Sequence, residues 1–372
     1  MITILVLGPA LTAVSGVTTH LNQLFRSSLA QEFCLVHFQV GSEGRAESML
    51  RKLLRFSWSP VQFMGALLRH RPQIVHVNTS MEPKSYWRDI VYVVMAKLLG
   101  KRVLYQVHGG ALPQVFFRNR LLKSLLAQVL RMVDEVVLLA QVELQEYRRF
   151  DAKLALRVIP NAIDIIPDPL VKYVVHHRPL ALVYVGRLAE AKGIFDLLEA
   201  LALVRQGGNQ ATLTIAGGGP ADAALRQRVE QLQLQDAVVF LGPVFGADKN
   251  QAWLSADVFG FPTYHNEGLP YALLEAMAAR TPALICPVAA IPDVMQDGVH
   301  GLFVPPRNPQ ALADAILRLD ADRELLRDMG QASRSRIEDH YSLARLAADF
   351  RDAYRSLSDG QEKAGANVPD VR

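Results

Sequence analysis

The chain has 372 residues, half of them apolar, with a formal net charge of +4. This length exceeds the size at which one hydrophobic core usually stops growing, so we expect two domains, and the apolar content is enough for two cores. No apolar run approaches the roughly 20 residues that a membrane-spanning helix needs, which argues against an integral membrane protein.

The charge is distributed unevenly along the chain. From Met1 to Asp164 there are 20 Lys and Arg against 11 Asp and Glu, a balance of +9, so the remainder carries −5. The basic half favours an anionic partner, such as a membrane surface, a nucleic acid or a phosphorylated acceptor.

The cysteines and the first residues bear on the location of the protein. Cys34 and Cys286 each lie in an apolar run, which predicts buried thiols in a reducing compartment rather than a disulfide framework. The opening MITILVLGPA lacks a positively charged region, so a first strand explains it better than a signal peptide. We therefore expect a cytoplasmic protein.

Short β-branched runs alternate with helical patterns in the first half, as is typical of a parallel sheet covered by helices. The predicted strands are Ile2 to Leu7, Cys34 to Gln39, Ile74 to Val77, Val103 to Val107, Glu135 to Leu139 and Arg157 to Ile159. The helical patterns include Val17 to Leu29 and Leu121 to Met132.

A second series follows a linker rich in proline and histidine, at Pro160 to Pro179. Its predicted strands are Leu180 to Val185, Thr212 to Ala216, Val238 to Leu241, Val258 to Phe261 and Ala283 to Cys286. Its predicted helices are Ile194 to Val204, Ala221 to Leu232 and Pro270 to Ala279, and a last helix is expected from Leu343 to Ser356. Two doubly wound units would bind ligands at the carboxyl ends of their strands.

Two carboxylates bracket a helix start in PTYHNEGLPYALLEAMA. Pro270 suits the first helical position, which places Glu267 before the helix and Glu275 in its second turn. The N–H groups of Gly268, Leu269 and Tyr271 would then offer a seat for a phosphate. A nucleotide sugar carries both phosphate and many hydroxyls. The simpler interpretation is that Glu267 caps the helix and Glu275 lies on a solvated face.

Two cations in YVGRLAEAKGIFDLLEAL favour the ligand interpretation. Arg187 follows a predicted strand and Lys192 precedes a helix, where both could stabilise charge that develops on a diphosphate. Either residue alone could be an ordinary surface cation. In TIAGGGPADAAL, Gly217 and Gly219 allow close backbone approach, but Asp222 occupies the third glycine position of a dinucleotide fingerprint.

The first half has two further candidate positions. In GPALTAVSGVTTHL, Ser15 and Gly16 begin a helix that could face a phosphate, and in LYQVHGG a strand ends at His108. That histidine could touch substrate or act as a base, although a lone histidine at a strand end is more often structural. Asp320 and Asp322 are a poor metal site, because residues two apart on a helix point in different directions.

These stretches together resemble the retaining glycosyltransferases of family 4, which depend on nucleotide sugars and have the GT-B fold. The motifs that carry the resemblance are IPNAID, VGRLAEAKG, AGGGP, FLGPV, EGLPYALLEAMA and DGVHGLFVPPRNPQALADAI. The resemblance implies two Rossmann-like doubly wound domains facing a central cleft, with a C-terminal helix crossing back to the first domain. We expect domains at 1–165 and 166–340, the crossing helix at 341–358 and a flexible tail at 359–372.

The resemblance also implies roles for the matched residues. Glu267 would contact the donor sugar, Glu275 the ribose, Arg187 and Lys192 the departing diphosphate, and His108 the transferred sugar. Backbone near Gly16, Gly217, Gly219, Gly268, Leu269 and Tyr271 would bind the donor. It implies retention by front-face attack, with a UDP- or GDP-sugar as donor, no metal and no cofactor.

Several positions depart from the family pattern. Ala162, Arg280, Ala289 and Ala290 stand where glycine is usual or frequent, and Ser15 stands where another glycine often lies. These departures concern the loops around the donor and leave both Glu residues and both cations in place.

First-domain segments vary with the acceptor in such enzymes, and the conspicuous one here is MLRKLLRFSWSPVQFMGALLRHRP. Arg51, Lys52 and Arg55 lie among apolar residues that include Phe56 and Trp58, a basic amphipathic stretch compatible with an anionic membrane surface. Packing against its own domain explains the pattern equally well.

The leading hypothesis is a cytoplasmic glycosyltransferase, at the inner face of the plasma membrane if the basic segment binds lipid, that acts on a glycan or lipid-linked acceptor of the cell envelope. No nucleic acid is expected as a partner. The alternatives are a nucleotide-sugar epimerase or a phosphorylase of similar architecture, although no motif for a pyridoxal-binding lysine is present, and a non-catalytic sugar-binding or assembly subunit.

Overall fold

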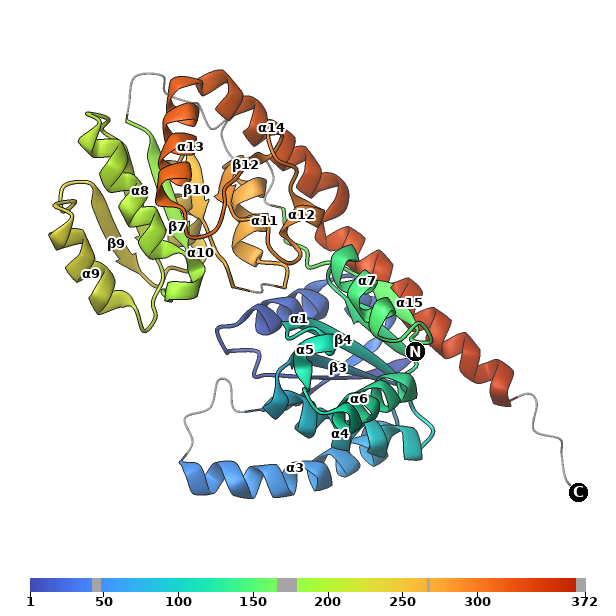
Figure 1. Ribbon diagram of the computed structural model, residues 1–372. Coiled ribbons are helices and arrows are strands. Elements are labelled where there is room, and N and C mark those ends of the chain that lie inside the picture. The colour runs from blue at the N-terminus through green and yellow to red at the C-terminus, as the bar shows by residue number, and fades with distance from the viewer. Residues whose placement is uncertain (42–47, 166–178, 266–267, 366–372) are drawn as a thin grey trace, which may run out of the picture. The chain divides into compact units, whose positions relative to one another are not determined.

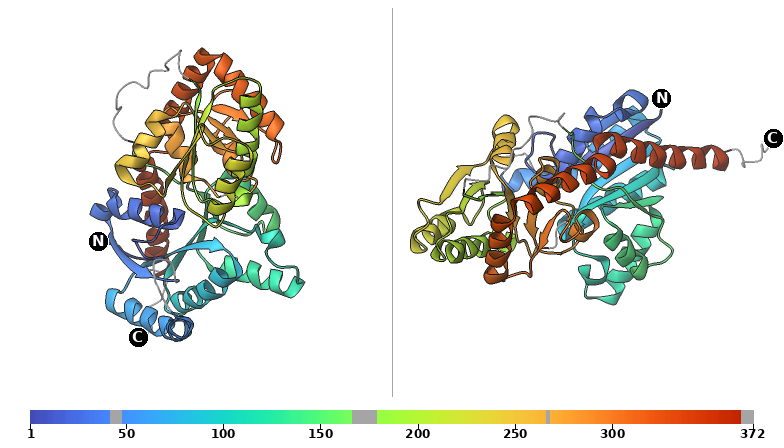
Figure 2. Two further views of the ribbon diagram at one scale, coloured as in Figure 1. Left: turned by 90° about the vertical axis from the view of Figure 1, so that its left-hand side faces the viewer. Right: turned by 90° about the horizontal axis from the view of Figure 1, so that it is seen from above.

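The computed structural model describes residues 1–41, 48–165, 179–265 and 268–365, and it divides the chain into two compact units. The first unit comprises residues 1–164 together with the chain from Leu343 onward, and the second comprises residues 165–342. Each is a parallel sheet with helices on both faces (Figures 1 and 2). This is the GT-B architecture of two Rossmann-like domains expected from the sequence.

The sheet of the first unit has six parallel strands in the order β2-β1-β3-β4-β5-β6. The strands are β1 (Thr3–Gly8), β2 (Cys34–Gln39), β3 (Ile74–Met81), β4 (Arg102–Gly110), β5 (Glu135–Leu138) and β6 (Leu156–Val158). Their buried, β-branched residues fit a sheet that is covered on both faces.

Helices of the first unit form two apolar layers, one on each face of its sheet. The helices are α1 (Gly16–Arg26), α2 (Leu29–Glu32), α3 (Met49–His70), α4 (Pro83–Leu98), α5 (Pro113–Phe116), α6 (Arg120–Met132), α7 (Gln141–Phe150) and α15 (Leu343–Gly365). Side chains from α3, α4, α6 and α7 share one core cluster, and side chains from α1, α2 and α15 share the other.

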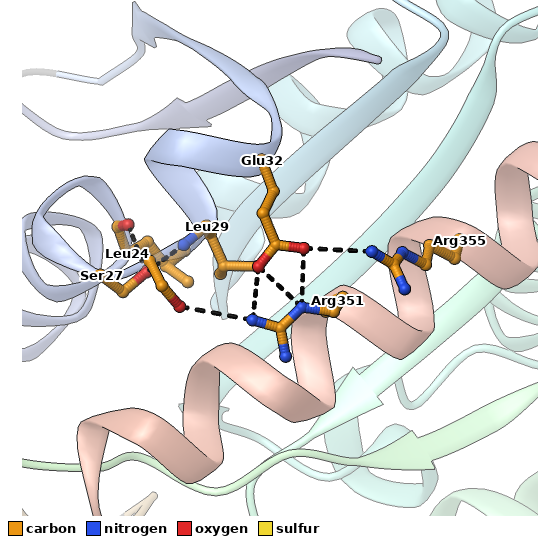
Figure 3. A network of polar contacts seen from close by, with 7 residues as sticks. Leu24, Ser27, Leu29, Glu32, Arg351 and Arg355 are labelled. Carbon is orange, nitrogen blue, oxygen red and sulfur yellow. Dashed lines mark hydrogen bonds and ion pairs between the residues drawn. The ribbon is translucent and has the colours of Figure 1, made fainter. Parts of the chain in front are cut away.

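The last helix, α15, completes the first unit although it follows the second in sequence. Phe350 and Tyr354 are fully buried against the sheet. At the surface, Arg351 donates to both carboxylate oxygens of Glu32 at 2.8 Å, and Arg355 reaches the same carboxylate at 3.2 Å (Figure 3). The prediction that the C-terminal helix returns to the first domain is confirmed.

The second unit has six parallel strands in the order β12-β11-β10-β7-β8-β9. The strands are β7 (Ala181–Val185), β8 (Thr212–Ala216), β9 (Val238–Gly242), β10 (Val258–Phe261), β11 (Ala283–Ile285) and β12 (Gly301–Phe303). The helices are η1 (Glu190–Lys192, a short 3₁₀ turn), α8 (Ile194–Gln206), α9 (Asp222–Gln231), α10 (Gly246–Ser255), α11 (Tyr271–Ala278), α12 (Ile291–Val294), α13 (Pro309–Ala321) and α14 (Arg323–His340).

The structure corrects several expectations. Cys34 is exposed rather than buried, because it is the first residue of β2 at the edge of its sheet, whereas Cys286 is buried. The last helix continues to Gly365, beyond its expected end at Ser356 and into the tail expected to be flexible. Strand β12 was not predicted. Within the described ranges no helix is long and apolar enough to cross a bilayer.

Candidate active site

The carboxyl edge of the second sheet brings together most of the site residues expected from the sequence. Strand β7 lies between β10 and β8, so the strand order changes direction at β7 and β10. Ligands bind at such switch points in doubly wound sheets. Arg187 and Lys192 follow β7, Gly217 and Gly219 follow β8, and the segment leading to α11 follows β10.

Backbone hydrogen bonds hold the turn that carries Lys192 against the segment after β10. The carbonyl oxygen of Ala191 accepts from the N–H groups of Tyr264 at 3.0 Å and His265 at 3.1 Å. Gly193 has φ +73°, and a Cβ there would lie 2.0 Å from the carbonyl oxygen of Pro262. Only glycine allows the two segments to approach so closely.

The glycines after β8 serve a similar approach. A Cβ at Gly217 would lie 1.8 Å from the carbonyl oxygen of Gly186, and one at Gly219 would lie 2.3 Å from that of Leu188. The N–H of Leu188 also donates to the carbonyl of Gly218 at 3.1 Å. The glycines are therefore required for packing the loop after β7, whether or not they also contact a ligand.

The two cations differ in their surroundings. The side chain of Arg187 is exposed, and its backbone carbonyl accepts from the buried hydroxyl of Tyr184 at 2.9 Å, which fixes the loop beneath it. Lys192 is half-buried, with its Nζ 5.8 Å from the centre of the Phe261 ring. This contact places the Lys192 ammonium beside Phe261, the last residue of β10, at the carboxyl edge of the sheet.

The start of α11 lies one residue later than expected. Pro270 is the cap and Tyr271 is the first helical residue, with no capping side chain. Gly268 is half-buried and Leu269 is buried, so their backbone lies in the segment that leads into the helix. Glu267 lies outside the described residues, so its predicted capping and sugar-binding roles have no structural test.

Glu275 has a partner that the sequence did not reveal. Lys249 of α10 donates to its carboxylate at 2.7 Å, across two helices of the second unit. Burial raises the pKa of the nearby Tyr271 hydroxyl well above its usual value, and the negative charge of Glu275 raises it further. The solvated-face interpretation of Glu275 is therefore wrong, because this carboxylate is partly buried and paired.

In the first unit, Gly16 begins α1 and Ser15 caps it. The Ser15 hydroxyl accepts from the N–H of Thr18 at 3.3 Å. Serine here supplies a cap that glycine could not, which gives this departure from the family pattern a structural reason.

At two other positions where glycine is usual or frequent in the family, the backbone has a positive φ. Arg280 has φ +56° and Ala289 has φ +49°. This left-handed region favours glycine, so both residues hold a conformation that costs side-chain-bearing residues energy.

His108 has a defined proton position. The Asn78 amide donates to the carbonyl oxygen of Leu7 at 3.1 Å, which turns its own oxygen toward Nε2 of His108 at 2.9 Å. An amide oxygen only accepts, so Nε2 of His108 carries the proton and Nδ1 presents a lone pair. Within the described part of the chain Nδ1 has no hydrogen-bond partner. Burial lowers the pKa of His108 to about 3, with a further contribution from His76.

Two more histidines surround His108. The His20 ring of α1 lies 4.7 Å from the His108 ring, and burial lowers its pKa well below the usual value. His76 of β3 bonds Tyr354 of α15 at 2.8 Å and Gln106 of β4 at 3.0 Å, and burial lowers its pKa to about 3. Neutral imidazoles therefore form the interior beside His108.

The residues considered as a metal pair have structural partners. Asp322 caps α14 by accepting from the N–H of Leu325 at 2.9 Å, so the helix expected to run through it is broken there. Asp320 pairs with Arg323 and accepts from Asn209 at 2.6 Å. Across the described residues no group of three or more His, Cys, Asp and Glu side chains is arranged to hold a metal ion.

Two family models together match most of the chain. The model described as "Glycosyltransferase Family 4" matches residues 15–166, and the one described as "Glycosyl transferases group 1" matches residues 171–336. The chain belongs to glycosyltransferase family 4. The boundary of the two matches falls in the segment that joins the two units.

Curated relatives in this family share about 30% identity over part of the chain. The amylovoran biosynthesis glycosyltransferase AmsK of Erwinia amylovora is 30% identical over 50% of the chain and 46% of its own length. A GDP-mannose-dependent phosphatidylinositol monomannoside mannosyltransferase of Mycobacterium tuberculosis is 31% identical over 55% of the chain and 57% of its own length. The chain thus spans about half the length of these relatives.

Solved structures resemble this family 4 chain over nearly all of its length. The sucrose-phosphate synthase of Thermosynechococcus elongatus has a TM-score of 0.80 at 19% identity and covers 97% of this chain and 100% of its own. The Anabaena protein HepE in complex with UDP has a TM-score of 0.76 at 17% identity and covers 95% of this chain and 100% of its own. At these identities the similarity establishes the fold.

Proposed function

We propose that the protein is a retaining glycosyltransferase that moves a sugar from a nucleoside diphosphate sugar to a hydroxyl of a glycan or lipid-linked acceptor. The observation that carries this proposal is the switch-point edge of the second sheet, where the turn with Lys192 is bonded to the segment that leads to α11. Cations and helix-start N–H groups suit a diphosphate better than they suit a neutral ligand.

The donor diphosphate would lie at that edge. Arg187 and Lys192 would neutralise its charge, and the backbone of Gly268 and Leu269 would donate to its oxygens. Charge on the diphosphate grows as its bond to the sugar breaks, so fixed cations stabilise the transition state more than the ground state.

The two acids would hold the hydroxyl-rich ends of the donor. Glu275 would bind the ribose, for which its carboxylate must share or leave Lys249. Glu267 would contact the hydroxyls of the sugar. For Gly217, Gly219 and Tyr271 we propose contacts with the donor in addition to the packing described above.

The first unit would contribute Gly16 near the phosphates and His108 at the transferred sugar. Nε2 of His108 is hydrogen-bonded to Asn78, and Nδ1 is a buried acceptor that has no partner among the described residues. For Nδ1 to accept a hydrogen bond from a sugar hydroxyl, the atoms that cover it would have to move aside when the donor binds.

The transfer would proceed on one face of the sugar. The bond from the anomeric carbon to the phosphate oxygen breaks, the acceptor oxygen bonds the same face, and the acceptor proton passes to the leaving phosphate. This balance leaves a nucleoside diphosphate and a glycoside with the donor's configuration, and it needs no metal.

Relatives support the kind of donor and acceptor. HepE binds UDP and, in a second structure, UDP-glucose, and the mycobacterial relative is named for GDP-mannose. AmsK is named for the biosynthesis of amylovoran. We therefore propose a UDP- or GDP-sugar as donor and cell-envelope polysaccharide synthesis as the setting. A cytoplasmic location would suit the exposed free thiol of Cys34.

A donor screen tests the proposal. A true donor at 100 times its dissociation constant should stabilise the native state by about 2.7 kcal/mol, which a thermal shift detects. With that donor and a glycan acceptor, Lys192→Ala should lower kcat by roughly a hundredfold or more, as loss of one charge-stabilising group does elsewhere. Arg226→Ala is the matched control, since Arg226 lies on the surface of α9.

A second pair of variants tests the role of the Glu275 carboxylate in donor binding. Glu275→Gln should raise the donor KM, whereas Glu230→Gln on the exposed face of α9 should change nothing. An unchanged kcat in Lys192→Ala together with an unchanged donor KM in Glu275→Gln would overturn the site assignment. Conversion of the donor without an acceptor would indicate an epimerase, and failure to bind any nucleotide would indicate a non-catalytic subunit.

A further inference from the structure

Helix α3 of the first unit exposes a long apolar stripe. Its members recur at the spacing of one helix face, four and three residues apart by turns. The exposed side chains of the stripe are Leu54 (61% exposed), Trp58 (60%), Val61 (52%) and Leu68 (63%). Gly65 continues the same row and is exposed too. Single exposed apolar residues are ordinary, but an aligned row along one helix marks an interaction surface.

The opposite side of α3 already has its partner. Phe63 and Leu67 are buried in the core cluster under the sheet, and the Ser59 hydroxyl bonds that of Tyr92 on α4 at 2.7 Å. These contacts already pack α3 against its own unit, so the exposed stripe on its other side is not part of the core of that unit. The two interpretations of this segment from the sequence, packing and interface, therefore apply to opposite sides of one helix.

The charge of the surroundings indicates the partner. The helix carries Arg51, Lys52, Arg55 and Arg69 and no Asp or Glu. From residue 49 to residue 133 there are 14 Lys and Arg against two acids, and of these cations Lys97 and Arg102 pair with Asp134 and Arg131 pairs with Asp151. The two acids of this range are Glu82 and Asp89, and Asp89 is fully buried and paired with Arg88.

Spacing places the cations beside the stripe. Arg55 follows Leu54 and Arg69 follows Leu68, so both begin one step round the helix from the apolar row. Arg69 is exposed and Arg55 is half-buried. Long arginine side chains can extend from such positions to a charged surface while their stems cover apolar area.

We infer that α3 lies in the headgroup region of an anionic lipid membrane, with the Leu54–Trp58–Val61–Leu68 stripe toward the acyl chains. A symmetric dimer through this helix would bring two copies of the same positive surface together, which like charges oppose. A nucleic acid would meet the cations but not the aliphatic side chains, which need a hydrocarbon environment. The helix would lie on the surface rather than across it, because its opposite side packs against its own unit through Phe63 and Leu67.

Vesicle binding by the full chain tests this inference and needs neither donor nor acceptor. The protein should sediment with phosphatidylglycerol vesicles and not with phosphatidylcholine vesicles. Binding should fall when salt rises from about 0.1 M to about 1 M, since the screening length shortens from about 10 Å to about 3 Å. Absence of binding to phosphatidylglycerol at low salt would overturn the inference.

Substitutions at exposed positions identify the face. Trp58→Glu and Leu68→Glu should each weaken partition about tenfold, because each removes an apolar side chain from lipid and adds a repelled charge. Leu317→Glu is the matched control, an exposed leucine (43%) on helix α13 of the second unit. Equal loss in the control and the α3 variants, or no loss in any, would exclude α3 as the lipid face.

A spectroscopic measurement avoids dependence on charge-changing variants. The chain has three tryptophans, so the double variant Trp87→Phe, Trp253→Phe leaves Trp58 alone. Its emission should shift to shorter wavelength on adding phosphatidylglycerol vesicles, as an indole that leaves water does. An unchanged spectrum with sedimented protein would place another surface on the lipid. A lipid-free dimer that Trp58→Glu dissociates would assign the stripe to a second copy and refute the membrane.

Discussion

Acidification should destabilise the first unit, because its interior holds imidazoles that are neutral in the folded chain. Burial lowers the pKa of His76 and of His108 to about 3, whereas an exposed imidazole titrates near 6.5. The folded pKa lies below the unfolded one, so below pH 6.5 the unfolded chain binds protons that the folded chain refuses. The stability is fully present above pH 6.5 and is lost as pH falls from there toward 3.

The size of the effect follows from the two pKa values. At pH 5 the proton uptake of one unfolded imidazole favours unfolding by about 2 kcal/mol more than at pH 7. His76 and His108 together therefore remove about 4 kcal/mol between pH 7 and pH 5, a large part of the stability of an ordinary domain. His20, whose pKa is also lowered, acts in the same direction.

Urea unfolding at the two pH values measures this loss. Trp58 and Trp87 report on the first unit and Trp253 on the second, so Trp253→Phe makes the fluorescence specific for the first. His76→Gln in that background removes one imidazole from the interior. The variant should lose about 2 kcal/mol less than its parent between pH 7 and pH 5, and buried carboxyl groups cancel in the difference.

The comparison can refute the reasoning. His76→Gln costs stability at both pH values because it disturbs the bonds to Tyr354 and Gln106. This loss of stability is the same at both pH values, so it does not affect the difference between them. If variant and parent show the same dependence on pH, His76 takes up protons equally in both states, and the neutral interior around it is wrong.

Three further outcomes follow from the second unit. Gly217→Ala should lower the free energy of unfolding in urea by several kcal/mol, because the new Cβ would lie 1.8 Å from a backbone carbonyl oxygen. Unchanged stability would show that the loop can move aside. Ala289→Gly should raise the free energy of unfolding by roughly 0.5 kcal/mol, as relief of a left-handed φ outweighs lost chain entropy; a decrease would contradict this. Lys249→Met should lower the donor KM by freeing Glu275, while a higher KM would mean that the pair positions the acid.

The strands were predictable where local chemistry is decisive. β2, β8 and β10 begin and end at the predicted residues, and Gly217 and Pro262 directly follow the last residues of β8 and β10. β12 has only three residues and was missed, since its pairing with β11 depends on the tertiary fold. Pro270 was placed one position too far into its helix, within the usual uncertainty of helix ends.

The site was only partly readable from the sequence for a similar reason. Arg187 and Lys192 follow a strand in a recognisable motif, and the structure keeps both at the same sheet edge. The ion pair of Lys249 with Glu275 joins two helices, and no spacing along the chain announces it. The clustered histidines His20, His76 and His108 come from one helix and two strands, so no spacing along the chain indicates that they lie together.

The place of α15 in the chain has a consequence for biosynthesis. On the ribosome, the strands β1 to β6 emerge long before Leu343, while the buried contacts of Phe350 and Tyr354 close one side of their sheet. Domains usually fold as units in the order of their translation. Here the first unit cannot complete its fold until the whole second unit and α15 have been synthesised. Nascent chains stalled before residue 343 should therefore expose the apolar face of the first sheet that α15 covers. They should bind chaperones until the final helix is released.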